Sequence, residues 1–227
     1  MPTLSDNYQA IMDTVALAAQ KSGRSMQEVS LVAVTKTVPA SVINEGAELY
    51  HTIGENKAQE LMDKAPLLDP RLEMHFIGHL QTNKVKYIVD KAALIHSVDH
   101  LKLAKEIDRL AEQNQKCQKI LLEINVSGEP SKFGASPEEA CKLAEEVLAL
   151  PHIRLCGLMT IAPYTLHPEE SRIYFERLRR LLEKLKKELN IPAMTHLSMG
   201  MSGDYGVAVE EGATLIRVGS ALFGQRS

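Results

Sequence analysis

The sequence predicts an α/β protein in which eight strands alternate with helices and close into a single (β/α)8 barrel, the TIM-barrel architecture. Short apolar runs of strand length recur eight times, helical patterns separate them, and the mean repeat is about 25–30 residues. The competing fold is an open, doubly wound sheet. That fold usually has fewer strands and a glycine-rich turn after the first one, whereas the first turn here, residues 35–39, contains no glycine.

Length and composition describe an ordinary globular protein. The chain has 227 residues, of which 44% are hydrophobic and 24% are charged, a mixture typical of globular domains. We expect one domain over residues 1–227, because no linker-like change in composition interrupts the alternation. The net charge of −3 shows no excess of positive charge, so it gives no support for nucleic-acid binding.

The cysteines and the first residues of the chain bear on its compartment. Cys117, Cys141 and Cys156 are odd in number and form no CxxC pair, which argues for a reducing compartment and against a disulfide framework. Residues 1–20 lack the basic segment and apolar core of a secretion signal, and no window reaches membrane-spanning length. We therefore expect a cytoplasmic protein with no membrane partner. Because a (β/α)8 barrel can be self-sufficient, we also expect a monomer.

The first half of the chain has clear element boundaries. Apolar residues recur at helical spacing from Leu4 to Ser22, and Gly23 ends that helix. Pro39 presets the backbone for a helix directly after the first strand. Asp99 is expected to cap a helix that runs to about Asn114. The expected strands are residues 29–35, 50–53, 73–77 and 94–97, and the expected helices between them are residues 39–49, 56–67 and 82–90.

The second half continues the alternation. Residues 119–125 form the most convincing later strand, and a loop over residues 127–134 follows it. Ser136 and Glu139 match a capping box with proline at the first helical position, which predicts a helix to Leu150. The remaining strands are expected at residues 153–158, 195–198 and 214–218, with helices at 167–189 and from the turn at 199–203 to Glu211.

Polar side chains follow the strands at the points where the strands end. In a barrel these loops share one face, and that face carries the active site. A barrel that needs only stability has no reason to place a lysine, an arginine and several hydroxyls at one rim. The strand-end residues are Lys36, Asn56, His79, Asp99, Asn125, Thr160, Ser198, Met199, Arg217, Gly219 and Ser220.

The last two loops predict an anion site. Barrels commonly bind phosphate between the loops after strands seven and eight. The segments 198–203 and 218–221 contain glycines that let backbone N–H groups approach an anion, hydroxyls that donate, and helix N-termini. Glycines in a single loop of this kind would usually only make a tight turn. Two such loops in the positions that barrels use favour a phosphate site.

A strand-end lysine facing a phosphate site suggests two kinds of chemistry. Lys36 could form an imine in a phosphosugar aldolase, or it could hold pyridoxal 5′-phosphate (PLP). Arg217 could reach a ring held between phosphate and lysine. There its guanidinium would donate to a pyridine nitrogen and disfavour protonation of that nitrogen. The alternatives are a lysine that only extends from a strand end and an arginine in a surface ion pair.

The histidines do not predict a metal centre. His75 and His79, like His96 and His100, are spaced as i and i+4. Each pair straddles a strand end rather than lying on one helix face, so we expect no metal site.

Several motifs resemble the YggS/PROSC family of pyridoxal-phosphate homeostasis proteins. The match runs from about residue 29 to residue 224 in the expected order, and the two C-terminal motifs are the most specific. One position departs from the family pattern, because Lys57 stands where an aromatic residue often follows Glu-Asn. The motifs are Val-Ala-Val-Thr-Lys (32–36), Ile-Gly-Glu-Asn (53–56), His-Phe-Ile-Gly-His-Leu-Gln-Thr-Asn-Lys (75–84), Ser-Val-Asp (97–99), Glu-Ile-Asn-Val-Ser (123–127), Gly-Leu-Met-Thr-Ile (157–161), Leu-Ser-Met-Gly-Met-Ser-Gly-Asp (197–204) and Arg-Val-Gly-Ser-Ala-Leu-Phe-Gly (217–224).

The resemblance implies a PLP-binding barrel of fold-type III, similar to the N-terminal domain of alanine racemase. It implies that Lys36 holds PLP as a Schiff base and that Arg217 faces the pyridine nitrogen. It places Ser198, Ser202, Gly219 and Ser220 at the phosphate, and Asn56 and Met199 along the ring. Such proteins resemble carriers or buffers of PLP that affect vitamin B6 and amino-acid pools without an established catalytic turnover. Their partners would be PLP and apo forms of PLP-dependent enzymes.

Two enzymatic alternatives remain open at this point. A PLP-dependent amino-acid racemase of the alanine racemase type needs a base on each face of the substrate, and this chain has no second domain to supply one. A lysine-dependent aldolase is disfavoured, because its lysine normally lies further round the barrel than the first strand.

Overall fold

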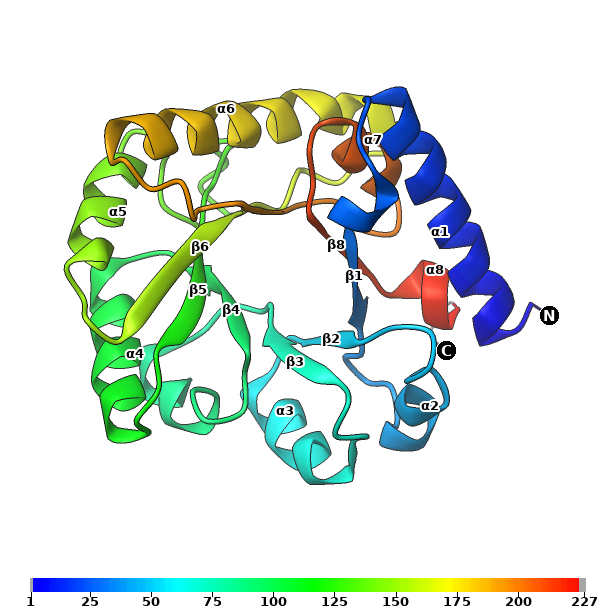
Figure 1. The fold of residues 1–227 in the computed structure, drawn as a ribbon, viewed down its shortest axis with the longest axis horizontal. Coiled ribbons are helices and arrows are strands. Elements are labelled where there is room, and N and C mark those ends of the chain that lie inside the picture. Colours follow the sequence, from blue (N-terminus) through cyan, green and yellow to red (C-terminus); the bar gives the residue numbers. More distant parts are fainter. Residues whose placement is uncertain (1, 225–227) are drawn as a thin grey trace.

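The computed structural model describes residues 2–224, and within them eight parallel strands close into a barrel in the order β1 to β8 (Figure 1). The first strand pairs with the last, so the sheet has no edge. The predicted (β/α)8 fold is confirmed. The strands are β1 (Ser30–Val34), β2 (Thr52–Glu55), β3 (Glu73–Phe76), β4 (Leu94–Val98), β5 (Gln118–Glu123), β6 (Ile153–Met159), β7 (His196–Ser198) and β8 (Leu215–Val218).

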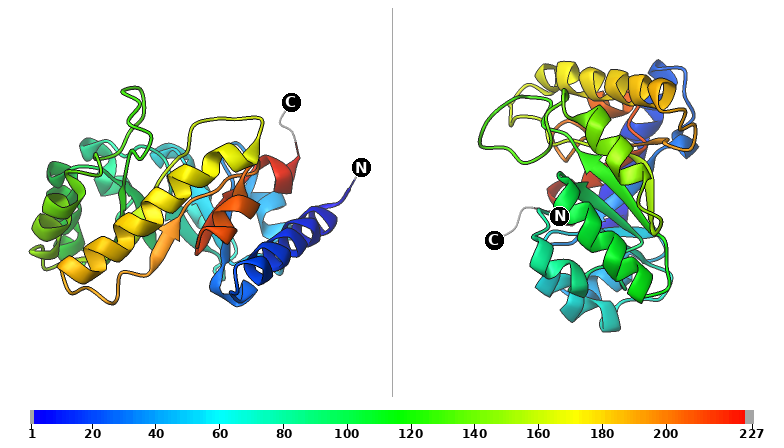
Figure 2. Two further views of the ribbon diagram at one scale, coloured as in Figure 1. Left: turned by 90° about the horizontal axis from the view of Figure 1, so that it is seen from above. Right: turned by 90° about the vertical axis from the view of Figure 1, so that its left-hand side faces the viewer.

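Helices surround the strands on the outside, as Figures 1 and 2 show from three directions. The first helix also packs beside the last two, which joins the start of the chain to its final turns. The α-helices are α1 (Leu4–Lys21), α2 (Ala40–Glu45), α3 (Ala58–Lys64), α4 (Leu101–Gln113), α5 (Ala140–Leu148), α6 (Arg172–Glu188), α7 (Tyr205–Glu210) and α8 (Ser220–Phe223). Short 3-10 helices are η1 (Met26–Glu28), η2 (Ala65–Leu67), η3 (Thr82–Tyr87) and η4 (Pro168–Ser171).

Two hydrophobic clusters follow from the alternation of side chains along each strand. The larger cluster lies between the strands and the helices and includes Ile53, Phe76 and Ile216. The smaller one fills the inside of the barrel. Residues two positions further along a strand share its face, so the inner face of β1 leads to Lys36. The inner cluster consists of Val32, Val34, Ile77, Leu94, Leu121, Cys156, Met159 and Leu215.

Local details differ from the expectations in three places. The segment expected as a helix over residues 82–90 is the 3-10 helix η3, in which N–H groups bond three residues back and no side chain caps the first turn. The expected cap Asp99 is wrong. His100 occupies the N-cap position of α4 without a capping bond, because the Asp99 carboxylate pairs with the His100 ring instead. The hydrogen bonds of the capping box are present, since Ser136 and Glu139 exchange both, but the helix does not start at Pro137: α5 begins at Ala140, after a turn.

Two kinds of feature are missing from the described part of the chain. No helix there is both long and apolar enough to cross a membrane. No group of three or more histidine, cysteine, aspartate or glutamate side chains gathers there in a way that could hold a metal ion.

Gly157 is required where β6 passes β7. A Cβ atom at this position would overlap the backbone carbonyl of His196, which cannot move without disturbing the pairing of the two strands. We expect Gly157→Ala to lower the free energy of unfolding by about 2–3 kcal/mol, measured by urea denaturation. Gly203→Ala is the matched control, because nothing lies within 4 Å of its added Cβ. Equal effects of the two substitutions would contradict the expectation.

Candidate functional site

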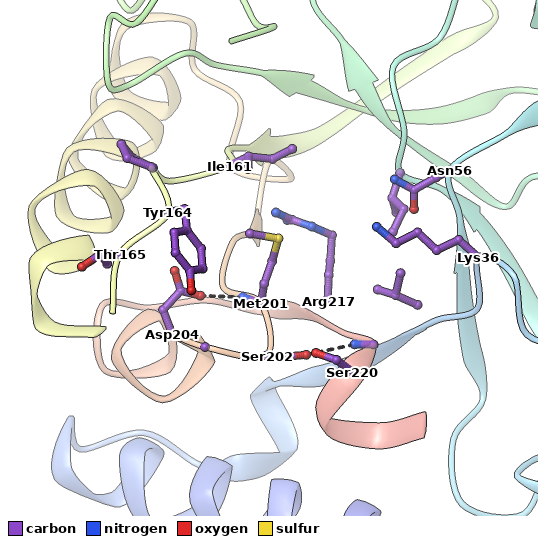
Figure 3. A pocket seen from close by; sticks show the side chains of 15 residues that line it. Lys36, Asn56, Ile161, Tyr164, Thr165, Met201, Ser202, Asp204, Arg217 and Ser220 are labelled. Atoms are coloured by element: carbon purple, nitrogen blue, oxygen red, sulfur yellow. Dashed lines mark hydrogen bonds between the residues drawn. The ribbon is translucent and has the colours of Figure 1, made fainter. Parts of the chain in front are cut away.

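A cavity of about 530 Å³ lies at the mouth of the barrel where the strands end. Figure 3 shows that its walls come from the loops after β1, β2, β6, β7 and β8. Six of the eight residues that the family resemblance places at the cofactor lie on these walls. The lining residues are Val34, Lys36, Asn56, Ile77, Ile161, Pro163, Tyr164, Thr165, Met201, Ser202, Gly203, Asp204, Arg217, Gly219 and Ser220.

Lys36 lies in the turn that follows β1. Its side chain is exposed to the cavity, and Figure 3 shows the amine extending toward Arg217. The Thr35 N–H donates to the Gly54 carbonyl of β2 at 3.1 Å, and the Val38 N–H donates back to the Thr35 carbonyl at 2.9 Å. These bonds fix the turn between the end of β1 and the start of α2. The amine therefore leaves the barrel on the side of the last two loops.

Asn56 lies beside Lys36 at the end of β2 (Figure 3). Its Oδ1 atom is buried and has no hydrogen-bond partner within the described residues. Gly78 packs against its backbone so closely that a Cβ there would overlap the Asn56 carbonyl. This close approach explains the glycine of the motif at residues 75–84. A buried acceptor without a donor is costly, so Asn56 is suited to receive a hydrogen bond from a ligand.

The loops after β7 and β8 converge on one point. The hydroxyl oxygen of Ser202 accepts the backbone N–H groups of Gly219 at 3.3 Å and of Ala221 at 3.2 Å. Converging N–H groups are the arrangement that binds anions, and here the Ser202 oxygen occupies the point where they meet. The Ser202 proton has no acceptor within residues 2–224. It is therefore free to donate into the cavity, next to Ser220.

Arg217 is a buried cation that faces this cavity, with 4% of its surface exposed. Its Nη1 donates to the Ser198 hydroxyl at 2.6 Å and its Nη2 donates to the Thr160 carbonyl at 2.8 Å. Burial lowers the pKa of Arg217 to about 10, while the charges of Glu123 and Asp204 act in the opposite direction. The guanidinium stays protonated at neutral pH. It forms no ion pair within the described residues, which leaves N–H groups for a ligand.

Of the eight residues that the resemblance places at the cofactor, Ser198 and Met199 do not line the cavity. The strand-end residues His79, Asp99, Asn125 and Thr160 do not line it either. Ser198 is fully buried below it, and its hydroxyl is already bonded to Arg217 and to the His96 ring. The Met199 side chain is also fully buried and packs in the cluster between strands and helices. The alternation along β7 explains both positions, because Ser198 faces inward and the next residue faces outward. Met201, two residues later, provides the methionine of the cavity wall.

Sequence reasoning missed a chain of hydrogen bonds through the barrel. The His96 Nδ1 lies 2.8 Å from the Ser198 hydroxyl, and the His96 Nε2 lies 3.0 Å from the His75 Nδ1. Arg217 can only donate, so the Ser198 proton goes to His96, and each ring then donates from Nε2. The histidines were considered only as i, i+4 pairs. The signal that could have found them is the inward-facing position of each on its own strand.

Burial keeps both rings neutral. It lowers the pKa of His75 to about 3, and the nearby His196 and Lys119 act in the same direction. Burial also lowers the pKa of His96 well below its ordinary value, and the neighbouring His75 and Arg217 lower it further by smaller amounts. A charged ring here would add a second cation beside Arg217, in a place with little water. Ser198, His96 and His75, which follow Arg217 in this series of hydrogen bonds, are therefore all uncharged.

Glu123 is a second buried group that sequence analysis did not select. It lies at the end of β5, and its Oε2 has no hydrogen-bond partner within the described residues. Burial and the neighbouring Asp99 charge raise the pKa of Glu123 to about 7, against the opposing effect of Arg217. The side chain can therefore hold or release a proton near neutral pH.

The neutral histidines predict a loss of stability in acid. Between pH 6.5 and about 3 the unfolded chain takes up protons that folded His75 excludes, and His96 behaves in the same direction. The free energy of unfolding should fall with pH in this window by about 1.4 kcal/mol per unit for each ring. His96→Gln lacks one of the two rings, so we expect its free energy of unfolding to fall less steeply with decreasing pH than that of the wild-type protein. Urea denaturation between pH 6.5 and 4.5 measures this.

The control for this prediction is Leu94→Ala, which changes packing in the inner cluster without removing a titratable group. It should lower stability equally at each pH. An unchanged pH dependence in His96→Gln would show that the ring is already charged in the folded protein.

Comparisons with known proteins identify the family of the chain. A family model described as the alanine racemase N-terminal domain matches residues 7–227. The chain is 47% identical over 226 residues to the pyridoxal phosphate homeostasis protein of Aquifex aeolicus, and the match covers 97% of each chain. It is 42% identical over 228 residues to the protein of the same name from Pseudomonas aeruginosa, covering 100% of this chain and 97% of that relative.

Solved structures match the fold. PipY of Synechococcus elongatus PCC7942, with PLP bound, matches with a TM-score of 0.82 at 36% identity, over 93% of this chain and 99% of its own. An alanine racemase of Clostridium difficile 630 matches with a TM-score of 0.71 over 97% of this chain and 57% of its own. At 15% identity, this match shows the fold alone. The chain therefore belongs to the family of pyridoxal phosphate homeostasis proteins, whose barrel is that of the alanine racemase N-terminal domain.

Proposed function

We propose that this protein binds PLP as a Schiff base on Lys36 and acts as a carrier or buffer of the cofactor in vitamin B6 and amino-acid homeostasis. One observation carries the proposal: the Lys36 amine, the buried Arg217 and the donors of the loops after β7 and β8 face one cavity. The names of the relatives and the PLP bound to PipY support it.

The phosphate is proposed to bind at the last two loops. Ser202, Gly219 and Ser220 supply hydroxyl and backbone donors there, and bonds of this kind to an anion are stronger than neutral ones. Ser198 is proposed to contribute through Arg217 rather than by touching the phosphate, because its hydroxyl has two partners already. The Met199 side chain faces outward, into the cluster between strands and helices, so we assign it no direct contact with the ring.

The ring is proposed to lie between Arg217 and Asn56. A pyridine nitrogen is a good acceptor for a guanidinium that lacks a carboxylate partner, and a cation beside it disfavours its protonation. The orphaned Oδ1 of Asn56 can accept a hydrogen bond from the opposite edge of the ligand. A ring held in this way is a weak electron sink, which suits storage of the cofactor better than catalysis.

Lys36 is proposed to form the covalent bond. In its neutral form the amine adds to the aldehyde carbon of PLP, a C=N bond replaces the C=O bond, and the carbonyl oxygen leaves as water. The same reaction in reverse, or exchange with another amine, returns the cofactor. An apo PLP-dependent enzyme is the proposed acceptor.

The geometry favours a carrier over an amino-acid racemase. A racemase needs a second base on the far side of the bound ring from Lys36. Apart from Lys36 and Arg217, the titratable groups among the described lining residues are Tyr164 and Asp204. Tyr164 is 87% exposed, and the Asp204 carboxylate accepts the Met201 N–H at 2.7 Å. Tyr164 therefore lies largely in solvent, and Asp204 is engaged in the turn at Met201, so neither fits the role of a second base. We further propose one cytoplasmic, monomeric domain over residues 1–227.

Loss of the lysine amine tests the proposal. Purified wild-type protein mixed with PLP should show the visible absorbance of a Schiff base, and borohydride reduction should add a phosphopyridoxyl mass to Lys36. Lys36→Ala should show neither, because no other amine lies on the described cavity walls. A colourless wild-type protein that ignores added PLP would overturn the proposed function. Trapping of a phosphosugar on Lys36, in protein stripped of PLP, would instead identify an aldolase.

Loss of one phosphate donor tests the position of the anion. We expect Ser202→Ala to weaken PLP binding about 10-fold, the value of one charge-assisted hydrogen bond, and to weaken binding of pyridoxal, which has no phosphate, by less than about 2-fold. Equilibrium titration measures both. Thr165→Ala is the matched control, since its hydroxyl lies on another wall of the cavity and bonds to Glu170. An equal loss for both ligands would place the phosphate elsewhere.

A further inference from the structure

A partly buried cluster of charges lies on the outer side of the barrel, behind the turn that carries Lys36. Glu55 of β2 is fully buried, and its Oε1 lies 2.7 Å from the Nζ of Lys64 on α3. The same Nζ lies 3.1 Å from the Oε2 of Glu60, also on α3. We call Glu55, Glu60 and Lys64 the turn clamp. None of the three lines the cavity, so the proposed function makes no use of them.

The turn clamp bonds to the residues on both sides of Lys36. Before the lysine, the Thr35 hydroxyl donates to Glu55 at 2.6 Å and the Thr35 carbonyl accepts from Lys64 at 2.8 Å. After the lysine, the Thr37 N–H donates to Glu60 at 2.7 Å. The backbone on either side of Lys36 is therefore held by charged groups that come from β2 and α3.

The backbone conformation of Thr37 is strained, so the turn needs stabilising contacts. Its φ of 63° lies in the left-handed region, which a β-branched residue rarely adopts and which costs free energy. The bond from its N–H to the Glu60 carboxylate offsets that cost. Partial burial opposes ionisation of Glu60, but the Thr37 N–H and Lys64 outweigh it and hold the pKa of Glu60 below its ordinary value. The carboxylate is thus charged at neutral pH and accepts strongly.

We propose that Glu55, Glu60 and Lys64 are positioning residues for Lys36, which direct its amine at the carbon with which it reacts. The proposal rests on the proposed function and adds to it the origin of the reactive geometry. With the clamp broken, Thr37 can relax out of the left-handed region, and the lysine side chain then leaves the barrel in another direction. Glu60 bonds to Thr37 and Lys64 rather than to Asn56, Arg217 or the loops after β7 and β8, so its loss should leave noncovalent binding of ring and phosphate unaffected.

Two ligands separate these effects. PLP needs both its noncovalent site and the lysine, whereas 4′-deoxypyridoxine 5′-phosphate keeps the ring and the phosphate but has no aldehyde. In Glu60→Ala we expect affinity for PLP to fall about 10-fold or more, since misplaced reactive groups lose at least that much. The Schiff-base absorbance should appear correspondingly more slowly. Affinity for the analogue should change by less than about 2-fold.

Conservative and matched variants complete the experiment. Glu60→Gln keeps an oxygen for the Thr37 N–H and should recover most of the PLP affinity. Glu139→Ala removes a carboxylate that accepts the Ser136 N–H in a distant loop, and it should leave both ligands unaffected. Lys64→Met combined with Glu55→Gln removes the buried ion pair and leaves the partly exposed Glu60 with the Thr37 N–H as its remaining partner. It removes the bonds that hold Thr35, so it should also weaken binding of PLP more than binding of the analogue. Urea denaturation checks that every variant is folded.

A readout without ligand tests the geometry itself. Amide hydrogen exchange at Thr37 should be slow in the wild-type protein and in Glu60→Gln, and fast in Glu60→Ala. Equal weakening of PLP and of the analogue, or no weakening of either, would overturn the clamp while the proposed function stands. A wild-type protein that binds the analogue and forms no Schiff base would overturn both.

Discussion

The pairing of β1 with β8 is the constraint on which the rest of the structure depends. It closes the barrel in the register that sets Val32 opposite Arg217 and Ala33 opposite Val218. Because side chains alternate along a strand, Arg217 faces inward and Lys36 continues the inward face of β1. The first and last strands of the chain thereby bring an amine, a guanidinium and the loop at Gly219 and Ser220 to one cavity. No local motif could do this without closure.

A chain of hydrogen bonds runs from Arg217, at the mouth of the barrel, through Ser198 to His96 and His75 inside it. Arg217 is the charged member of this chain, and the groups beneath it are neutral. Arg217 is oriented by a hydroxyl and a carbonyl, both neutral, and so retains its positive charge for a ligand. His96 and His75 complete the chain as neutral rings whose proton positions follow from the guanidinium's inability to accept. The charges that hold the Lys36 turn, by contrast, lie outside the barrel. The two halves of the site are therefore supported by separate polar networks.

Much of this could be predicted from the sequence, because the relevant signals are local. Strand length, helical spacing and the position of Lys36 after an apolar run are properties of a few adjacent residues, and so are the glycines and serines of the last two loops. Where a second element decides the outcome, local reasoning failed. Asp99 was expected to cap a helix although His100 engages it. The resemblance placed Met199 along the ring, whereas its side chain takes the outward face that follows Ser198.

The groups that were missed have partners far away in the chain. His75 and His96 lie on different strands, and Ser198 lies on a third, so their contact depends on barrel order and register rather than on spacing. Glu55, Glu60 and Lys64 do stand close together in sequence. Their spacing alone indicates an ordinary helix-surface ion pair. Only the position of the Thr35–Thr37 turn against α3 shows what the three side chains hold.

A crystal structure of the protein soaked in PLP would test the central claim most directly. The account predicts continuous electron density from the Lys36 Nζ to the cofactor, with the phosphate within hydrogen-bonding distance of Ser202, Gly219 and Ser220. Density joined to a different lysine, or a phosphate bound away from the loops after β7 and β8, would contradict it.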